Sequence, residues 1–339
     1  MSIKKNLCIA LLLAMPCYAS AGSVAYVSNQ DGAVTVIDLE TMEVKGHLEI
    51  DAKGARGIGV TQDGKWLITA NKDDGNISVV DTASGKLVRH VAIGKNPEFL
   101  RVQDDNAYVT FEPGVGNDPV PQQTAVADDK IPGHIAVVAL STGKLLLDIV
   151  GKPETEGLEL GKQGLIVANE SDNSLSMHDF NSGKLLKNIS VARYGDRPRG
   201  IKASPDGSLY VATLEFSSKF LVLNDKFEII KEVATGKSPV GISFDHDGKR
   251  VFVASSKEKA LQVYDAKTWA KLEDIPVGDR CWHFTFTPDN QQILLACGKS
   301  NELLVIDANR LEVTKRISNR GLPWGIVTYP KAMGSLDRP

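Results

Sequence analysis

The stretch from Gly57 to Val91 reads GIGVTQDGKWLITANKDDGNISVVDTASGKLVRHV and contains one complete structural unit. Four short runs rich in apolar residues follow one another, each bounded by Gly, Asn, Asp or Ser, which is the pattern of β-strands joined by tight turns. The Asp63-Gly64 step separates the first run from the second, and Asp81 ends the third. The stretch therefore predicts four antiparallel strands, at 57–61, 66–70, 77–81 and 86–91.

The same unit recurs along the chain with a period near 42 residues. Successive spacings of 43, 58, 40, 45, 41 and 42 residues separate the equivalents of Asp81, which are Asp38, Asp81, Ala139, Asp179, Asn224, Asp265 and Asp307. Four short strands in about 40–45 residues are typical of one blade of a β-propeller. Seven first strands and seven second strands are recognisable, so we predict an all-β fold, a seven-bladed β-propeller of four-stranded blades.

The two ends of the repeat region predict how the ring closes. The repeats begin at 24–28, which is a second-strand sequence, and finish at 325–329, which is a first-strand sequence. One blade would then combine three N-terminal strands with one C-terminal strand, and this closure leaves only short, protected edges. We expect a single domain over residues 22–339.

The first residues have the pattern of a secretory signal peptide. Lys4 and Lys5 precede the apolar run 7–15, and Ala19-Ser20-Ala21 supplies small residues for cleavage. We therefore expect residues 1–21 to be removed and the protein to be periplasmic or secreted; lipidation at Cys17 or a retained anchor is the alternative. No later segment approaches the ~20 apolar residues of a membrane span.

Cleavage would leave Cys281 and Cys297 as the remaining cysteines in an oxidising compartment. They lie on the two arms of one predicted hairpin, and a three-residue loop centred on Asp289 would place them directly opposite each other. A cross-strand disulfide is one interpretation, and two small buried thiols are the other. The spacing of His, Cys and carboxylate residues resembles no zinc, copper or haem site, so no metal is expected.

Charge and motifs narrow the classes of function. Without Lys4 and Lys5 the chain has 37 basic and 42 acidic residues, a difference of about −5, which does not indicate a general nucleic-acid surface. The chain has no GxSxG, P-loop or HExxH motif and no GxGxxG that opens a helix. Catalysis is therefore not indicated, and binding is favoured.

One residue of each repeat is predicted to face the mouth of the central channel. In register, with spacings of 42, 58, 43, 41, 42 and 42 residues, these are Arg56, Glu98, Glu156, Arg199, Val240, Trp282 and Trp324. In the functional interpretation, Arg56 and Arg199 bind the carboxylates of a planar anionic ligand between the indole faces of Trp282 and Trp324. In the alternative, the Arg and Glu side chains neutralise one another and the Trp rings only pack.

The third repeat carries about 16 additional residues. They fall within 112–133, a segment rich in Pro, Gly, Asp and Gln, between the predicted second and third strands of that blade. Its position predicts a loop on the same face as the mouth, where it would be either a lid or partner site or a tolerated insertion.

Several motifs resemble those of a known family. AYVSN at 25–29, LITAN at 67–71 and LIVAN at 165–169, together with the Ser-Pro-Asp-Gly turn at 204–207, resemble the YVTN family of β-propeller repeats. RCW at 280–282, KSNELLVID at 299–307 and LPWGIV at 322–327 are similar to the last blades of the PQQ-dependent catabolism-associated propellers. This resemblance implies a periplasmic protein encoded with quinoprotein alcohol-oxidation systems, and it supplies no catalytic residues.

We therefore expect a non-catalytic propeller that binds a ligand or a partner, linked to PQQ-dependent alcohol oxidation. The ligand would be PQQ or a related small anionic aromatic molecule, and the partner a quinoprotein dehydrogenase or another periplasmic protein. The alternative is an enzyme that uses the channel mouth, such as a lactonase-like hydrolase. A bound metal or a close pair of carboxylates at the mouth would favour the enzyme, because either could activate a water molecule.

Overall fold

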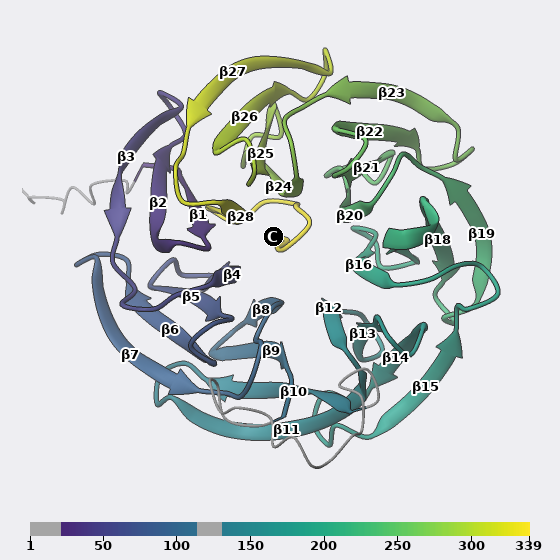
Figure 1. Cartoon of the computed structure of the whole chain (residues 1–339), viewed down its shortest axis with the longest axis horizontal. Helices are drawn as coiled ribbons and strands as arrows, with labels where there is room; N and C mark the ends of the chain where they lie inside the picture. Colours follow the sequence, from purple (N-terminus) through teal and green to yellow (C-terminus); the bar gives the residue numbers. More distant parts are fainter. Residues whose placement is uncertain (1–21, 114–130) are drawn as a thin grey trace, which may run out of the picture.

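In the computed structural model, which describes residues 22–113 and 131–339, the chain forms seven four-stranded antiparallel sheets arranged as a ring. Figure 1 looks along the axis of this ring, with the sheets placed like blades around it. The fold predicted from the repeats is confirmed, including the number of blades. The expected signal peptide, 1–21, and most of the insertion, 114–130, lie outside the described residues.

The blade that closes the ring is built from both ends of the repeat region, as predicted. Its order from the channel outward is β28-β1-β2-β3, so the last strand pairs with the first. These strands are β28 (Pro323–Tyr329), β1 (Val24–Asn29), β2 (Gly32–Asp38) and β3 (Glu43–Leu48). The next two blades contain β4 (Ala55–Val60), β5 (Trp66–Asn71), β6 (Asn76–Asp81) and β7 (Lys86–Ala92), then β8 (Leu100–Gln103), β9 (Asn106–Phe111), β10 (Pro132–Ala139) and β11 (Lys144–Pro153).

The other four blades follow the same order along the chain, with the first strand innermost. They contain β12 (Thr155–Leu160), β13 (Leu165–Asn169), β14 (Ser174–His178) and β15 (Leu185–Ser190); β16 (Pro198–Ala203), β17 (Leu209–Leu214), the 3-10 helix η2 (Glu215–Ser217), β18 (Lys219–Asn224) and β19 (Ile229–Ala234); β20 (Pro239–Phe244), β21 (Arg250–Ser255), β22 (Ala260–Asp265) and β23 (Lys271–Pro276); β24 (Cys281–Phe286), β25 (Gln292–Cys297), β26 (Glu302–Asp307) and β27 (Glu312–Ser318).

The repeated aspartate has a structural role at the turn after the third strand of the blades that carry it. The Oδ1 atom of Asp265 accepts hydrogen bonds from the backbone N–H groups of Lys267 and Thr268, at 3.0 and 2.7 Å. Asp38 and Asp307 accept equivalent bonds from the second and third residues that follow them. An aspartate that bonds its own turn in this way favours the turn over a continued strand, which explains the period seen in the sequence.

The core lies between neighbouring blades, where the sheets pack face to face. Phe252 of β21 contacts Phe286 of β24 with ring centroids 5.2 Å apart, and Phe220 of β18 contacts Tyr264 of β22 at the same separation. Both pairs are edge-to-face and cross from one blade to the next, so they hold adjacent blades together. Outer strands such as β7 alternate exposed with half-buried residues, because only one of their faces is covered.

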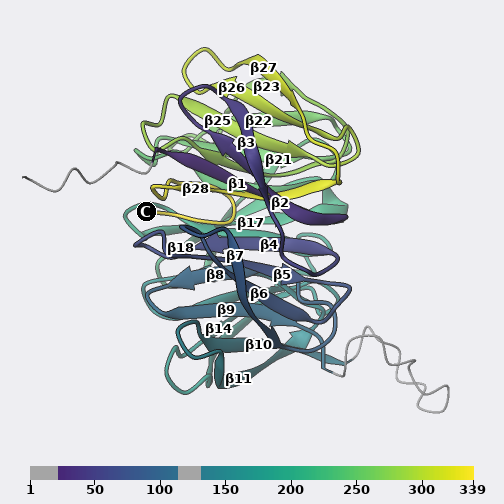
Figure 2. The same cartoon turned by 90° about the vertical axis from the view of Figure 1, so that its left-hand side faces the viewer.

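The residues after β28 turn into the ring and form a tail along its channel. Met333 and Ser335 of this tail exchange backbone hydrogen bonds with Phe286 and Phe284 at 2.8 and 2.9 Å, so the tail pairs with the inner edge of β24. Figure 1 shows the tail at the centre of the ring, and Figure 2 shows its end at one face. The described residues include no helix long and apolar enough to cross a membrane.

Candidate functional site

Each of the seven predicted mouth residues follows, by two positions, a residue in the left-handed backbone conformation. These preceding residues have φ between 51° and 71° and are Gly54, Asn96, Glu154, Arg197, Ser238, Arg280 and Leu322. Such φ values are costly for residues other than glycine, and here they recur once per blade. The chain therefore enters every innermost strand through the same sharp turn.

A β-bulge then lies at the mouth residue itself. The pairing register of the innermost strand shifts at six of the seven positions, which are Arg56, Glu156, Arg199, Val240, Trp282 and Trp324. A bulge redirects the side chain and ends regular pairing. The repeated turn and bulge explain why residues in the same sequence register gather at one end of the channel.

The same turn brings a second set of residues to the mouth. The backbone N–H of Glu170, one residue beyond β13, donates to the carbonyl of Glu154 at 2.8 Å. The N–H groups of Lys72 and Glu215 make the equivalent bonds, both of 2.9 Å, to Gly54 and Arg197. The residue that follows a second strand therefore lies beside the mouth ring, a relation absent from our sequence prediction.

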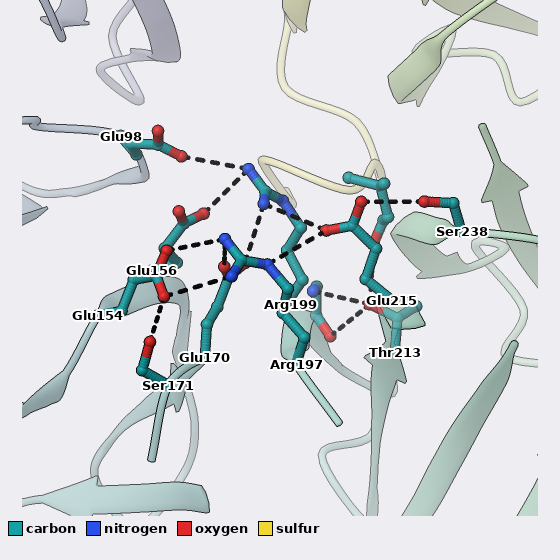
Figure 3. Close-up of polar contacts among 12 residues, drawn as sticks. Glu98, Glu154, Glu156, Glu170, Ser171, Arg197, Arg199, Thr213, Glu215 and Ser238 are labelled. Atoms are coloured by element: carbon teal, nitrogen blue, oxygen red, sulfur yellow. Dashed lines mark hydrogen bonds and ion pairs between the residues drawn. The ribbon is translucent and has the colours of Figure 1, made fainter. Parts of the chain in front are cut away.

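Arg199 is at the centre of the resulting ion network, which Figure 3 shows. Its Nη1 atom lies 2.9 Å from Glu170 and 3.3 Å from Glu215, and its Nη2 atom lies 3.0 Å from Glu156 and 3.2 Å from Glu98. The four carboxylates come from three blades, and the Arg199 side chain is only 13% exposed. Arg199 therefore links these blades electrostatically rather than presenting a free guanidinium.

Arg197 forms a more exposed layer above Arg199. Its guanidinium pairs with Glu154 at 2.7 Å and with Glu170, and lies 3.8 Å from Glu215. It also lies over the ring of Phe216, 5.1 Å from the centroid, and that ring is 65% exposed. An arginine stacked on an exposed aromatic ring makes this part of the mouth accessible to another molecule.

Arg56 belongs to the other side of the network. It pairs with Glu98, which also lies 3.6 Å from Lys72, and its Nε donates to the side-chain oxygen of Gln30 at 3.1 Å. Its guanidinium is 6.0 Å from the ring centroid of Trp324. Burial lowers the pKa of Arg56 to about 10, so the group remains cationic near neutral pH.

The two tryptophans differ in accessibility. Trp324 is 2% exposed, and its ring packs against His283 and Phe99 with centroids 4.2 and 5.5 Å apart. Trp282 is partly exposed and packs against Gly298, where an added Cβ would lie 1.9 Å from the indole. Trp324 therefore forms the floor beneath Arg56, while Trp282 is available at the surface.

Burial and charge also change the acid–base properties of the cluster. The pKa of Glu170 is raised well above its usual value of 4.5 because burial disfavours its charged form, and Arg199 opposes this effect only in part. Burial lowers the pKa of Arg199, but the neighbouring glutamates more than reverse this effect and raise it overall. Burial therefore favours the protonated form of Glu170.

Three carboxylates of the cluster are close enough to hold one ion. Oxygen atoms of Glu154, Glu156 and Glu170 lie within 4.8 Å of one another. Each of these residues also pairs with Arg197 or Arg199. A cation would therefore compete with guanidinium groups that already neutralise these carboxylates.

The structure brings Arg56, Glu98, Glu156 and Arg199 into one network, with Trp324 beneath it. Val240 is 1% exposed and Trp282 lies at the edge. The other members of the network are not among the predicted mouth residues; they are Lys72, Glu154, Glu170, Arg197 and Glu215. The predicted loop 112–133 follows the end of β9, but its bounds are too wide at both ends. Glu112 forms a β-bridge with Lys95, and β10 begins at Pro132.

Cys281 and Cys297 are joined by a disulfide between β24 and β25. The hairpin register is one residue away from the expected one, because Phe284 pairs with Leu295. The bulge at Trp282 restores the pairing of Cys281 with Cys297. The two cysteines are therefore opposite each other because of this bulge, and not because of the three-residue loop that the sequence prediction assumed.

Comparisons with known proteins agree on the propeller fold. Residues 8–109 match the family described as the Cytochrome D1 heme domain, which is less than half of the chain. The chain is 22% identical over 339 aligned residues to the dihydro-heme d1 dehydrogenase of Pseudomonas aeruginosa, covering 89% of this chain and 62% of that protein. It thus spans about three fifths of the length of this relative.

Two solved structures illustrate the range of similar folds. The periplasmic gluconolactonase PpgL of Pseudomonas aeruginosa superposes with a TM-score of 0.73 at 16% identity, covering 90% of this chain and 98% of that one. The dihydro-heme d1 dehydrogenase NirN in complex with DHE superposes with a TM-score of 0.63 at 18% identity, covering 88% and 63%. At these identities the comparisons show the fold, and function has to be argued from the site.

Proposed function

We propose that this chain is a secreted, non-catalytic propeller that binds a partner protein at its channel mouth. The observation that carries the proposal is the layer formed by Arg197 and Phe216 above a closed ion network. Arg and aromatic residues are enriched in protein interfaces, and they dominate binding energy where they are packed and desolvated. Glu154 and Arg197, each 26% exposed, and Lys72, 35% exposed, add charges of both signs around this layer.

A partner fits this mouth better than the small planar anion that the sequence suggested. Arg56 and Arg199, the groups expected to hold such an anion, already pair with glutamates. An incoming carboxylate would have to displace one of them and leave it buried without its cation, which is costly. A protein surface with both acidic and basic groups can instead add to the network without breaking it.

The biological setting of the proposal rests on resemblance. The YVTN-type and PQQ-associated motifs support a periplasmic partner in quinoprotein-linked oxidation, with residues 22–339 as the mature domain. The similarity to a periplasmic gluconolactonase supports the same compartment. The similarity to a heme d1 dehydrogenase supports a role near redox cofactors.

The residues of the mouth do not fit coordination of heme iron. His283 is the one histidine of the described residues on an innermost strand, and it is 1% exposed. Its ring packs against Trp324 and Phe99, and its Nδ1 lies 3.0 Å from the hydroxyl of Ser335. An axial ligand has to reach the metal directly, and this imidazole is covered from the mouth.

The test is a partner-capture experiment with matched surface variants. Phe216→Ala and Arg197→Ala should each reduce recovery of the periplasmic partner at least tenfold, because each removes part of the exposed layer. Leu272→Ala is the control, because Leu272 is 50% exposed on the outer strand β23. Equal recovery with all three variants would show that the mouth is not the interface.

A second candidate function, a lactonase-like hydrolase, is favoured by the closeness of Glu154, Glu156 and Glu170. Grouped carboxylates can hold a divalent cation that activates water. Hydrolysis of gluconolactone should then depend on added Ca²⁺ or Mg²⁺ and be lost in Glu156→Gln. Absence of turnover with either metal would leave the binding proposal as the better account.

A further inference from the structure

A cavity of about 690 Å³ lies at the end of the channel opposite the mouth. Its wall includes the turns after the first strands of three adjacent blades, at 62, 103–104 and 161–162, together with the tail residues Lys331, Asp337 and Arg338. This volume is within the range of sites for small molecules, roughly 300–1,000 Å³. The cavity shares none of its lining residues with the network around Arg199.

The charged groups at this end do not balance. Arg101, Lys202 and Arg338 all face one carboxylate, Glu159, at 3.3, 3.4 and 3.6 Å. Lys331 pairs with the other carboxylate, Asp337, at 3.0 Å. Four basic side chains thus share two acidic side chains, and all of these groups except Arg338 have side chains no more than 7% exposed.

The acid–base properties show the cost of this excess positive charge. Burial lowers the pKa of Lys202 to about 7, and Arg101 opposes its protonation further. Burial of like charges without enough counter-charge is unfavourable, and an anion of suitable size would relieve it. Lys162 and Asp104 at the rim are exposed, and their opposite charges cancel.

Three buried polar atoms on the cavity wall also have no hydrogen-bond partner among the described residues. They are Nε of Arg101, a donor, and Oε1 of Glu159 and Oδ2 of Asp337, which are acceptors when ionised. The side chain of Arg101 is 5% exposed, and both of its Nη atoms are bonded. Unsatisfied buried atoms are rare in folded proteins, and an anionic ligand is one way to satisfy the Arg101 donor.

Part of the cavity wall is apolar and aromatic. Tyr108 and Phe180 lie edge to face with centroids 6.3 Å apart, and Leu160 lies beside them in the cavity wall. A ligand in this cavity would meet both flat apolar groups and cations. Such a combination selects a molecule with one charged group and one ring.

We propose that this cavity binds a small aromatic anion, a carboxylate or a phosphate, whose charged group lies near Arg338 and Lys331 and whose ring packs against Phe180. The proposal is independent of the partner interface, because it uses the other end of the channel. The sequence predicts a site for a small aromatic anion at the mouth. The present proposal assigns such a site to the other end of the channel, to residues that the repeat register does not single out.

The test is calorimetric titration of the chain from residue 22 at low salt with benzoate, phenyl phosphate and inorganic phosphate. One aromatic anion should bind per chain, and neutral benzyl alcohol should not bind. Arg338→Gln should weaken binding at least tenfold. Lys249→Gln should leave it unchanged, because Lys249 is 77% exposed on the turn between β20 and β21, at the same end of the ring but outside the cavity wall. Phe180→Ala should weaken binding of the two aromatic anions but not of inorganic phosphate.

The outcomes separate the alternatives. Stronger binding of phenyl phosphate than of benzoate would identify a phosphate ligand, and the reverse would identify a carboxylate. If Arg338→Gln lowers the melting temperature, Lys162→Gln at the exposed rim replaces it and should give a smaller effect in the same direction. Arg197→Ala should not affect the titration, which separates this site from the mouth. Failure of every anion to bind at millimolar concentration, or equal affinity of Arg338→Gln and Lys249→Gln, would overturn the proposal.

Discussion

Replacing Arg199 with Met tests whether the mouth network stabilises the ring. Glu156 is 5% exposed and has its one described ion pair with Arg199, so the substitution leaves a buried carboxylate without a cation. Breaking a buried pair in this way typically costs about 3–5 kcal/mol. We therefore expect the free energy of unfolding, measured by urea denaturation at pH 7, to fall by about this amount.

The double variant Arg199→Met/Glu156→Gln should recover about 1–3 kcal/mol of that loss, because the amide needs no cation and residues in contact couple by this amount. Arg316→Met is the matched control. Its pair with Glu302 is on the outer surface with Arg316 54% exposed, so its loss should cost less than about 1 kcal/mol. A loss below 1 kcal/mol for Arg199→Met, or no recovery in the double variant, would refute the reasoning.

Three further predictions follow from single features. The pKa of Glu170 is raised in the folded state, so its contribution to stability is present below pH 4.5 and is lost as the pH rises through the folded pKa. In Glu170→Gln the free energy of unfolding should therefore depend less on pH over this range. Parallel curves of unfolding free energy against pH for the two proteins would contradict this prediction. In the chain from residue 22, thiol titration after denaturation without reductant should find neither Cys281 nor Cys297 free, whereas two titratable thiols would exclude the disulfide. Gly298→Ala should displace the Trp282 ring and change the near-ultraviolet circular dichroism while the far-ultraviolet spectrum is retained; an unchanged near-ultraviolet signal would show that the contact is not as tight as described.

The fold was predictable because the same local sequence pattern recurs in all seven repeats. Strand alternation, the turn aspartate and the first-strand sequence at 325–329 all favour one closed ring, and such agreement between levels specifies a structure. Individual registers were harder to predict. The bulge at Trp282 adds one residue to the strand, and no local preference in the sequence marks it.

The mouth was predictable only in part, for a physical reason. The ring of Arg56, Glu98, Glu156 and Arg199 follows from the repeat register, since each member lies at or just before the start of an innermost strand. Glu170 and Glu215 instead come directly after second strands. The equivalent position is Lys72 in one blade and Ser256 in another. Applying the register to that position as well would have found them. Ion pairs between blades cannot be read from any single repeat.

The two ends of the channel have opposite electrostatic character, and this contrast decides where a charged ligand should bind. At the mouth, the four basic side chains of Arg56, Lys72, Arg197 and Arg199 face the five acidic side chains of Glu98, Glu154, Glu156, Glu170 and Glu215. At the tail end, four basic side chains share two acidic ones. An anion that approaches along the axis is therefore attracted more strongly to the tail end than to the mouth, an effect that added salt should reduce. The tail itself supplies Lys331 and Arg338, so the same segment that fills the channel also creates the site at its end.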